Sequence, residues 1–101
     1  MLLYEWDEDK NAANKRKHGI SFETAAKVFN DANWVLIEDR VDEGGEQRWH
    51  AIGLVGSTAL VVVHVYRKEQ EQDNAKEVVR IISAREADQR ERRSYLQQAV
   101  E

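Results

Sequence analysis

The first thirty residues have the spacing of a short strand followed by two helices. An apolar run over residues 2–6 ends at Asp7, which favours a helix N-cap, and Gly19 is placed to end the helix that this predicts over residues 8–18. Ser21 predicts the next N-cap, before apolar residues at helical spacing: Phe22, Ala25, Ala26 and Phe29. We expect this second helix to pack on the core.

From Trp34 onward the pattern changes to that of strands and tight turns. Residues 34–37 predict a strand, and residues 46–55 alternate between two faces. Residues 59–67 form a valine-rich run without alternation, which is typical of a central strand covered on both faces. Turns are predicted at residues 42–45 and at residues 56–57.

The C-terminal third predicts a loop, a strand and a helix. Residues 68–76 are polar and lack periodicity, so we expect a mobile loop there, before a last strand over residues 78–83. The string Ser83-Ala84-Arg85-Glu86 matches a capping box and predicts a helix from this point onward. The order predicts an α+β fold with a mostly antiparallel, four- to five-stranded sheet, two N-terminal helices and one C-terminal helix, all on one side of the sheet.

The composition is that of one small globular domain. The chain has 101 residues, and we expect residues 1–101 to form a single domain. It has no cysteine, which excludes disulfides, thiolate zinc sites and cysteine nucleophiles. We expect no secretory leader and no membrane span, because the apolar runs are short and interrupted, and therefore a cytoplasmic protein.

Charge is unevenly distributed along the chain. The formal net charge of -4 disfavours proteins that coat nucleic acid through bulk positive charge. However, residues 10–18 sum to +4 and residues 80–93 to +2, whereas residues 5–9 and residues 38–46 each sum to -4. The first helix has no apolar stripe, and it carries polar residues at i, i+4 and i+7 that are left to face a partner: Lys10, Asn14 and Lys17.

Four arginines are candidates for an anion-binding site. Arg85 falls in the first turn of the predicted last helix, where the helix dipole disfavours a cation, and such violations mark ion pairs or functional sites. Arg80 lies within an apolar strand, and Arg48 and Arg67 lie at the ends of strands expected to neighbour it. If the strands pair as consecutive hairpins, the four converge at one edge of the sheet, where guanidinium groups can bind phosphate and stabilise a phosphorane-like transition state. The alternative is that each arginine pairs with one of the surplus acids.

The histidines do not suggest a metal site. Their positions lack metal-ligand spacing, and we expect no metal and no other cofactor. His50 shares its predicted strand face with Arg48, which makes it the candidate for proton transfer. We interpret His64, on the valine-rich strand, as a hydrogen-bonded core histidine.

Strings of residues along nearly the whole chain resemble the BrnT family of type II toxins. One string lies near the N-terminus, one in the middle and one toward the end: Lys17-His18-Gly19-Ile20-Ser21-Phe22, Glu46-Gln47-Arg48-Trp49 and Arg80-Ile81-Ile82-Ser83-Ala84-Arg85. The first and last strings, at this separation, are specific for the family.

The resemblance implies a RelE-like fold and a ribonuclease that blocks translation. RelE-like toxins cleave RNA without metal, use the ribose 2′-OH as nucleophile and rely on basic residues more than on a fixed triad. The resemblance carries catalytic candidates over to four arginines, with the histidine as a further candidate for acid–base work: Arg48, Arg67, Arg80, Arg85 and His50. Contacts to RNA are predicted for Lys10, Asn14, Lys17 and Arg92.

The resemblance also implies a BrnA-type antitoxin that neutralises the toxin, with operator DNA contacted only through that antitoxin. The alternative function is a protein-binding module and co-repressor without catalysis, in which the first helix and the arginine-rich last helix dock an acidic antitoxin. Direct DNA binding is disfavoured because the sequence has no helix-turn-helix pattern and the net charge opposes it.

Overall fold

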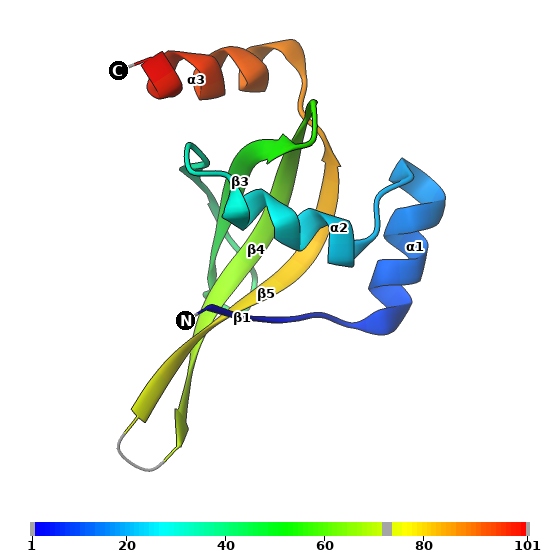
Figure 1. Ribbon diagram of the computed structural model, residues 1–101. Helices are drawn as coiled ribbons and strands as arrows, with labels where there is room; N and C mark the ends of the chain where they lie inside the picture. Colours follow the sequence, from blue (N-terminus) through cyan, green and yellow to red (C-terminus); the bar gives the residue numbers. More distant parts are fainter. Residues whose placement is uncertain (1, 72–73, 101) are drawn as a thin grey trace.

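One twisted five-stranded sheet forms the centre of the protein, with strands in the order β1-β5-β4-β3-β2 (Figure 1). The computed structural model describes residues 2–71 and 74–100. β1 runs parallel to β5, and every other pair of neighbours is antiparallel. The strands are β1 (Leu2–Glu5), β2 (Val35–Val41), β3 (Gln47–Val55), β4 (Thr58–Glu71) and β5 (Asn74–Glu86). The predicted α+β fold with a mostly antiparallel sheet is confirmed.

Three α-helices accompany the sheet: α1 (Glu8–His18), α2 (Phe22–Ala26) and α3 (Gln89–Val100). A 3-10 helix, η1 (Lys27–Asn30), continues α2. The Asp7 carboxylate accepts hydrogen bonds from the Asp9 and Lys10 amides at the start of α1, and Gly19 ends it with φ 75° and a bond to the Lys15 carbonyl. The two N-terminal helices and the one C-terminal helix are therefore as predicted.

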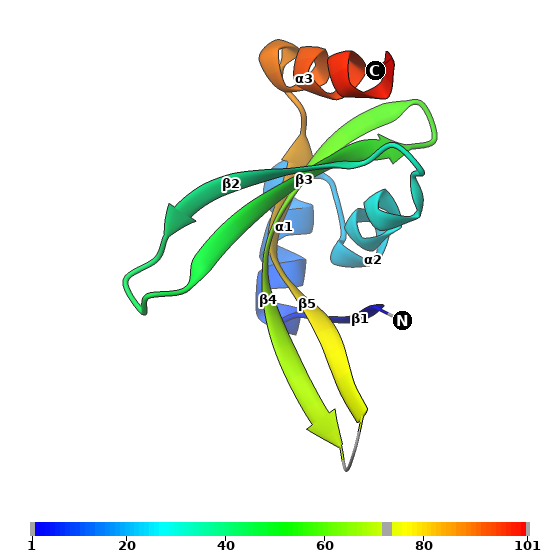
Figure 2. The same ribbon diagram turned by 90° about the vertical axis from the view of Figure 1, so that its left-hand side faces the viewer.

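Each face of the sheet carries its own apolar cluster. On one face, Phe22, Ala25 and Val28 of α2 and η1 pack against alternate residues of the central strands: Ala51, Leu60, Val62, Val79 and Ile81. On the other face, Tyr95 of α3 packs against Val35, Ile52, Ala59 and Val61. The expectation that all helices lie on one side is wrong for α3, which covers one end of the opposite face (Figure 2).

The valine-rich strand is central, as predicted. Val61 and Val62 are fully buried although they point to opposite faces, and β4 lies between β3 and β5. Buried apolar side chains on both faces remove the alternation that an exposed strand would show.

The prediction of a loop over residues 68–76 is wrong. β4 continues to Glu71 and β5 begins at Asn74, so the two strands extend as a ribbon beyond the rest of the sheet (Figures 1 and 2). Lys68 stands opposite Glu77, and residues of opposite charge across a strand pair stabilise the pairing. An exposed ribbon needs no apolar periodicity, which is why the pattern failed to predict it. Residues 72–73 lie outside the described residues.

The start of the last helix also differs from the prediction. β5 continues through Ser83-Ala84-Arg85-Glu86, and pairing with β4 extends to a bond from the Ala87 amide to the Ala59 carbonyl, 2.9 Å. The reciprocal capping bonds are made instead by Asp88 and Glu91, at 2.8 and 2.9 Å. Arg85 is therefore a strand residue, and the helix-dipole argument does not apply to it.

Replacing Tyr95 with phenylalanine is expected to lower the free energy of unfolding by about 1 to 2 kcal/mol. The Tyr95 hydroxyl donates to Asp31 Oδ2 over 2.6 Å, and this bond to a carboxylate raises the pKa of Tyr95 to about 12. Urea unfolding measures the change. Tyr66→Phe is the control, because no hydrogen bond joins its hydroxyl to the described part of the chain, and equal effects of the two substitutions would contradict the assignment.

Candidate active site

The candidate catalytic residues lie on one face of the sheet, which we call the arginine face: Arg48, His50, Arg67, Arg80 and Arg85. Strand register places them there. His50 stands opposite Val63, Arg80 opposite Val65 and Arg85 opposite Val61, and residues two apart on a strand share a face. This is the face that α3 covers at one end, opposite the face that packs on α2.

The arginines share a face but do not meet at one point. Arg85 is level with Val61 on β4, and Arg67 lies six residues further along the same strand, which corresponds to about 20 Å. Arg48 and Arg80 flank Val65 between these two ends. The arginine face is therefore a row of cationic groups rather than the single cluster that the sequence predicted at one edge.

Arg67 and Arg80 are held together by one carboxylate. Glu5, at the end of β1, accepts hydrogen bonds from Arg67 Nε over 2.8 Å, from Arg67 Nη2, and from Arg80 Nη1 over 3.0 Å. These bonds, that from Arg67 first, lower the pKa of Glu5 to about 2. β1 brings Glu5 there because it pairs in parallel with β5, with Glu5 level with Arg80.

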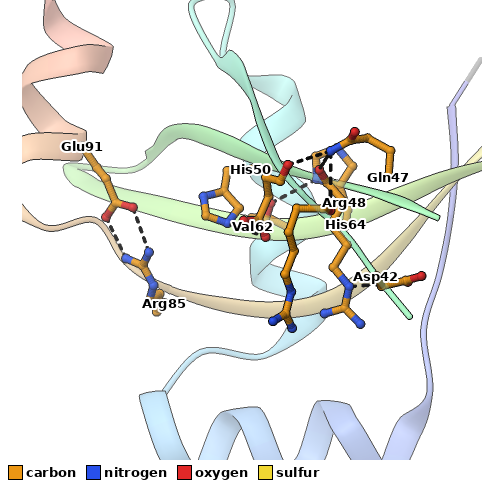
Figure 3. Close-up of polar contacts among 10 residues, drawn as sticks. Asp42, Gln47, Arg48, His50, Val62, His64, Arg85 and Glu91 are labelled. Atoms are coloured by element: carbon orange, nitrogen blue, oxygen red, sulfur yellow. Dashed lines mark hydrogen bonds and ion pairs between the residues drawn. The ribbon is translucent and has the colours of Figure 1, made fainter. Parts of the chain in front are cut away.

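Arg85 makes a two-pronged ion pair with Glu91 near the start of α3 (Figure 3). Nη1 and Nη2 of Arg85 donate to the two carboxylate oxygens over 2.7 and 2.8 Å. The hydrogen bonds from Arg85 are the main reason that the pKa of Glu91 falls to about 2. The same carboxylate caps α3, so Arg85 also helps to fix the helix over the end of the arginine face.

Arg48 lies beside a cavity of about 460 Å³ at the β2–β3 turn, lined also by Arg40 and Asp42. Arg48 Nε is 3.6 Å from Asp42 Oδ2, too far for a hydrogen bond, and this buried nitrogen has no hydrogen-bond partner among the described residues. Asp42 instead accepts bonds from the backbone amides of the turn. The guanidinium group is therefore the least satisfied of the four.

Of the histidines, His50 and His64 point to opposite faces of the sheet. His50 lies on the arginine face with Nε2 3.3 Å from Asp39 Oδ2. His64 is fully buried on the other face, where Nδ1 bonds to the Val62 carbonyl over 3.0 Å and burial lowers its pKa to about 4. The interpretation of His64 as a hydrogen-bonded core histidine is confirmed.

Asn14 does not belong to an exposed polar stripe, which corrects the grouping of Asn14 with Lys10 and Lys17. Its amide donates to the carbonyls of Ile20 and Ala84 over 2.8 and 2.9 Å and accepts from the Ala84 amide over 3.1 Å. It thus satisfies the edge of β5 beyond the point where β1 ends. We therefore do not retain Asn14 as an RNA contact.

The other predicted RNA contacts are exposed but lie outside the arginine face. Lys10 and Lys17 are on α1, which packs beside β5 and α2. Arg92 is on α3, where it lines a small groove with Leu54 and Leu96. None of these side chains joins the row itself.

Four carboxylates of the site were missed from the sequence: Glu5, Asp39, Asp42 and Glu91. The sequence supplied only a surplus of acids and the alternative that the arginines pair with them. That alternative is confirmed for Arg67, Arg80 and Arg85 by hydrogen-bonded ion pairs.

Residues 6–91 match the family described as ribonuclease toxin, BrnT, of type II toxin-antitoxin system. The chain belongs to the BrnT family. The matched segment contains all four arginines and His50, and it ends at Glu91, the partner of Arg85. A comparison with curated proteins finds no match.

The family is described as ribonuclease toxins of type II toxin-antitoxin systems, and such a system implies an antitoxin partner. Within residues 2–71 and 74–100, no three side chains of His, Asp or Glu come together as metal ligands. No helix in that part of the chain is long and apolar enough to cross a membrane.

Acid is expected to destabilise this BrnT-family fold through Glu5 and Glu91. Their pKa falls from 4.5 to about 2 on folding, so each stabilises the fold above pH 4.5, and this contribution is lost as the pH falls toward 2. Both are partly exposed to solvent, so we expect about 1 to 2 kcal/mol from each. Urea unfolding at pH 6, 4 and 3 measures the loss. The pH dependence should flatten in a Glu5→Gln/Glu91→Gln variant, and an unaltered slope would assign it to other groups.

Proposed function

We propose that this chain is a metal-independent endoribonuclease that cleaves RNA in the cytoplasm, inhibits translation and is neutralised by a BrnA-type antitoxin. The observation that carries the proposal is the arginine face, which lies within the segment that matches a family of ribonuclease toxins. A row of guanidinium groups of about 20 Å suits the backbone of a single RNA strand, whose phosphates are the negative groups to be bound.

The scissile phosphate binds between Arg67 and Arg80, the two guanidinium groups that already share one anionic group, Glu5. Arg48 and Arg85 support it by binding neighbouring phosphates. The ribose O2′ attacks phosphorus as the P–O5′ bond breaks, which gives a 2′,3′-cyclic phosphate and a 5′-hydroxyl. The arginines stabilise the charge that develops on the phosphorane oxygens. His50 takes the proton from O2′, and water supplies the proton to O5′.

In this mechanism the phosphate binds beside Glu5, which stays in place. Arg67 uses Nε and Nη2 to hold Glu5, and Arg80 uses Nη1. Because a guanidinium group carries five N–H donors, donors of both residues remain for a phosphate beside the carboxylate. Lys10, Lys17 and Arg92 are exposed and are proposed as flanking contacts to RNA.

A second candidate function is a protein-binding module without catalysis that acts as co-repressor with the antitoxin. The pairing of Arg67, Arg80 and Arg85 with carboxylates favours it, because neutralised guanidinium groups bind anions less strongly. In this alternative the antitoxin contacts operator DNA, and the exposed Leu96 and Arg92 of α3 contribute to docking.

RNA cleavage in vitro separates the two candidates. Purified protein is incubated with messenger RNA, alone in a buffer containing EDTA and with ribosomes in a buffer containing the magnesium that ribosomes require. The ribonuclease proposal predicts 5′-hydroxyl fragments in at least one of these reactions and growth arrest on induced expression. Absence of fragments in both reactions would contradict catalysis and favour the protein-binding module.

A further inference from the structure

A β-bulge in β2 places two residues of that strand opposite Arg48. Glu38 stands opposite Trp49 and Val41 opposite Gln47, so that Asp39 and Arg40 together face the single residue Arg48. Such an insertion breaks the regular alternation of side chains and re-aims those at the bulge. Without it, the register that pairs Ile37 with His50 would continue unbroken along β2.

The side chain of Gln47 holds this bulge. Its Nε2 donates to the carbonyl of Asp39 and to the carbonyl of Arg48, both over 2.8 Å, and approaches the Arg40 carbonyl at 3.5 Å (Figure 3). Carbonyls released from the strand ladder at a bulge need such a donor. The Gln47 side chain thus fixes the backbone of the bulge from which Asp39 projects.

Asp39, at this bulge, lies beside His50. Asp39 Oδ2 is 3.3 Å from His50 Nε2, and no hydrogen bond or ion pair joins the other ring nitrogen, Nδ1, to the described part of the chain. His50 lies two residues from Arg48 on the same strand and therefore on the arginine face, opposite Val63. The carboxylate holds the proton on Nε2 and leaves Nδ1 free to accept another.

The other carboxylates that contact the arginines are poorly suited to proton transfer. Glu5 and Glu91 are each bonded to a guanidinium group, which holds the pKa of both near 2, and Asp42 is engaged by the turn amides. His50 is the histidine of this face, since His64 lies on the other.

We infer that Asp39 is a positioning residue, which orients His50 so that Nδ1 accepts the proton of the ribose 2′-OH. This inference rests on the proposed ribonuclease function. The proton moves from O2′ to Nδ1 as the O2′–P bond forms, and Asp39 stabilises the imidazolium through Nε2–H without taking a proton itself. The geometry resembles the general arrangement in which a carboxylate fixes the tautomer of a catalytic histidine.

The test compares Asp39→Asn with Glu38→Gln, a matched loss of one charge at the neighbouring exposed residue of β2. We expect Asp39→Asn to lower kcat for RNA cleavage at least about tenfold with KM little changed, and Glu38→Gln to leave both unchanged. Gln47→Met, which removes the donor that holds the bulge, should lower kcat in the same way. Thermal unfolding checks that the variants are folded.

A second measurement does not depend on activity. In 15N NMR spectra, His50 of the unaltered protein should carry its proton on Nε2, and Asp39→Asn should shift the tautomer toward Nδ1. Equal kcat in Asp39→Asn and Glu38→Gln, or a His50 proton on Nδ1 in the unaltered protein, would overturn the inference while leaving the ribonuclease proposal intact. A protein that cleaves no RNA but shows the expected tautomer shift would retain the positioning role and contradict the ribonuclease proposal.

Discussion

Replacement of Arg80 with alanine is expected to lower the rate of RNA cleavage by about 100-fold or more, while the protein stays folded. Arg80 and Arg67 both donate to Glu5, beside which we propose that the scissile phosphate binds, and loss of one fixed donor to a transition-state oxyanion lowers rates by about two to three orders of magnitude. The Arg80 side chain is 41% exposed, so its ion pair with Glu5 contributes little to stability, about 1 kcal/mol or less.

The measurement is the initial rate of cleavage of an RNA oligonucleotide, with circular dichroism as the check on folding. Arg93→Ala provides a matched control: Arg93 is exposed on α3 and makes no hydrogen bond or ion pair with the described part of the chain. Arg80→Lys keeps the charge but loses the fork of donors, so its rate should fall between those of the unaltered protein and Arg80→Ala. Equal rates for Arg80→Ala and Arg93→Ala would remove Arg80 from the site.

Replacement of Asn14 with alanine is expected to lower the free energy of unfolding by about 2 to 4 kcal/mol. Asn14 is 7% exposed and makes three hydrogen bonds to backbone groups of Ile20 and Ala84, which the substitution leaves without partners. An unsatisfied buried polar group costs about 1 to 3 kcal/mol. For a domain of this size, the melting temperature should fall by roughly 10 °C or more.

Thermal unfolding of Asn14→Ala beside Lys17→Ala tests this structural role. Lys17 is exposed on the same helix, so its loss should change the melting temperature little. If Asn14→Ala melted like the unaltered protein but bound RNA more weakly, the sequence interpretation of Asn14 as an RNA contact would be restored.

The elements of the fold that sequence predicted well are those fixed by neighbouring residues. Asp7 and Gly19 bound α1 as expected because a cap acts within one helical turn. Gly56, with φ 63°, forms the tight turn between β3 and β4 that its place before Ser57 indicates. The shared face of Arg48 and His50 followed from simple alternation along one strand.

The elements that sequence did not predict depend on contacts between distant residues. The capping box at Ser83 does not begin a helix, because this segment pairs with β4 and the ladder bonds continue as far as Ala87. The anchoring of α1 was also not predicted. This helix has no apolar stripe, and Asn11 and Asn14 instead attach it by hydrogen bonds to the backbone of α2 and β5.

The candidate site was predictable in its cations but not in its anions. Glu5 is 62 residues from Arg67 and 75 from Arg80, so only the parallel pairing of β1 with β5 reveals their contact. Asp39 lies beside His50 at a bulge, which shifts the strand register and has no sequence signal in the alternation of β2. The net charge alone indicates neither the row of arginines nor the carboxylates that pair with them.

The most direct test of the arginine face is to map where RNA binds. A short RNA with 2′-O-methyl groups cannot be cleaved through O2′, and it is titrated into 15N-labelled protein while backbone amide and arginine Nε–H signals are followed by NMR. If RNA binds along the arginine face, the signals that shift most are those of Arg48, His50, Arg67, Arg80 and Arg85. Shifts confined to the opposite side of the sheet, around Thr24 and Leu36, with the arginine signals unmoved, would contradict it.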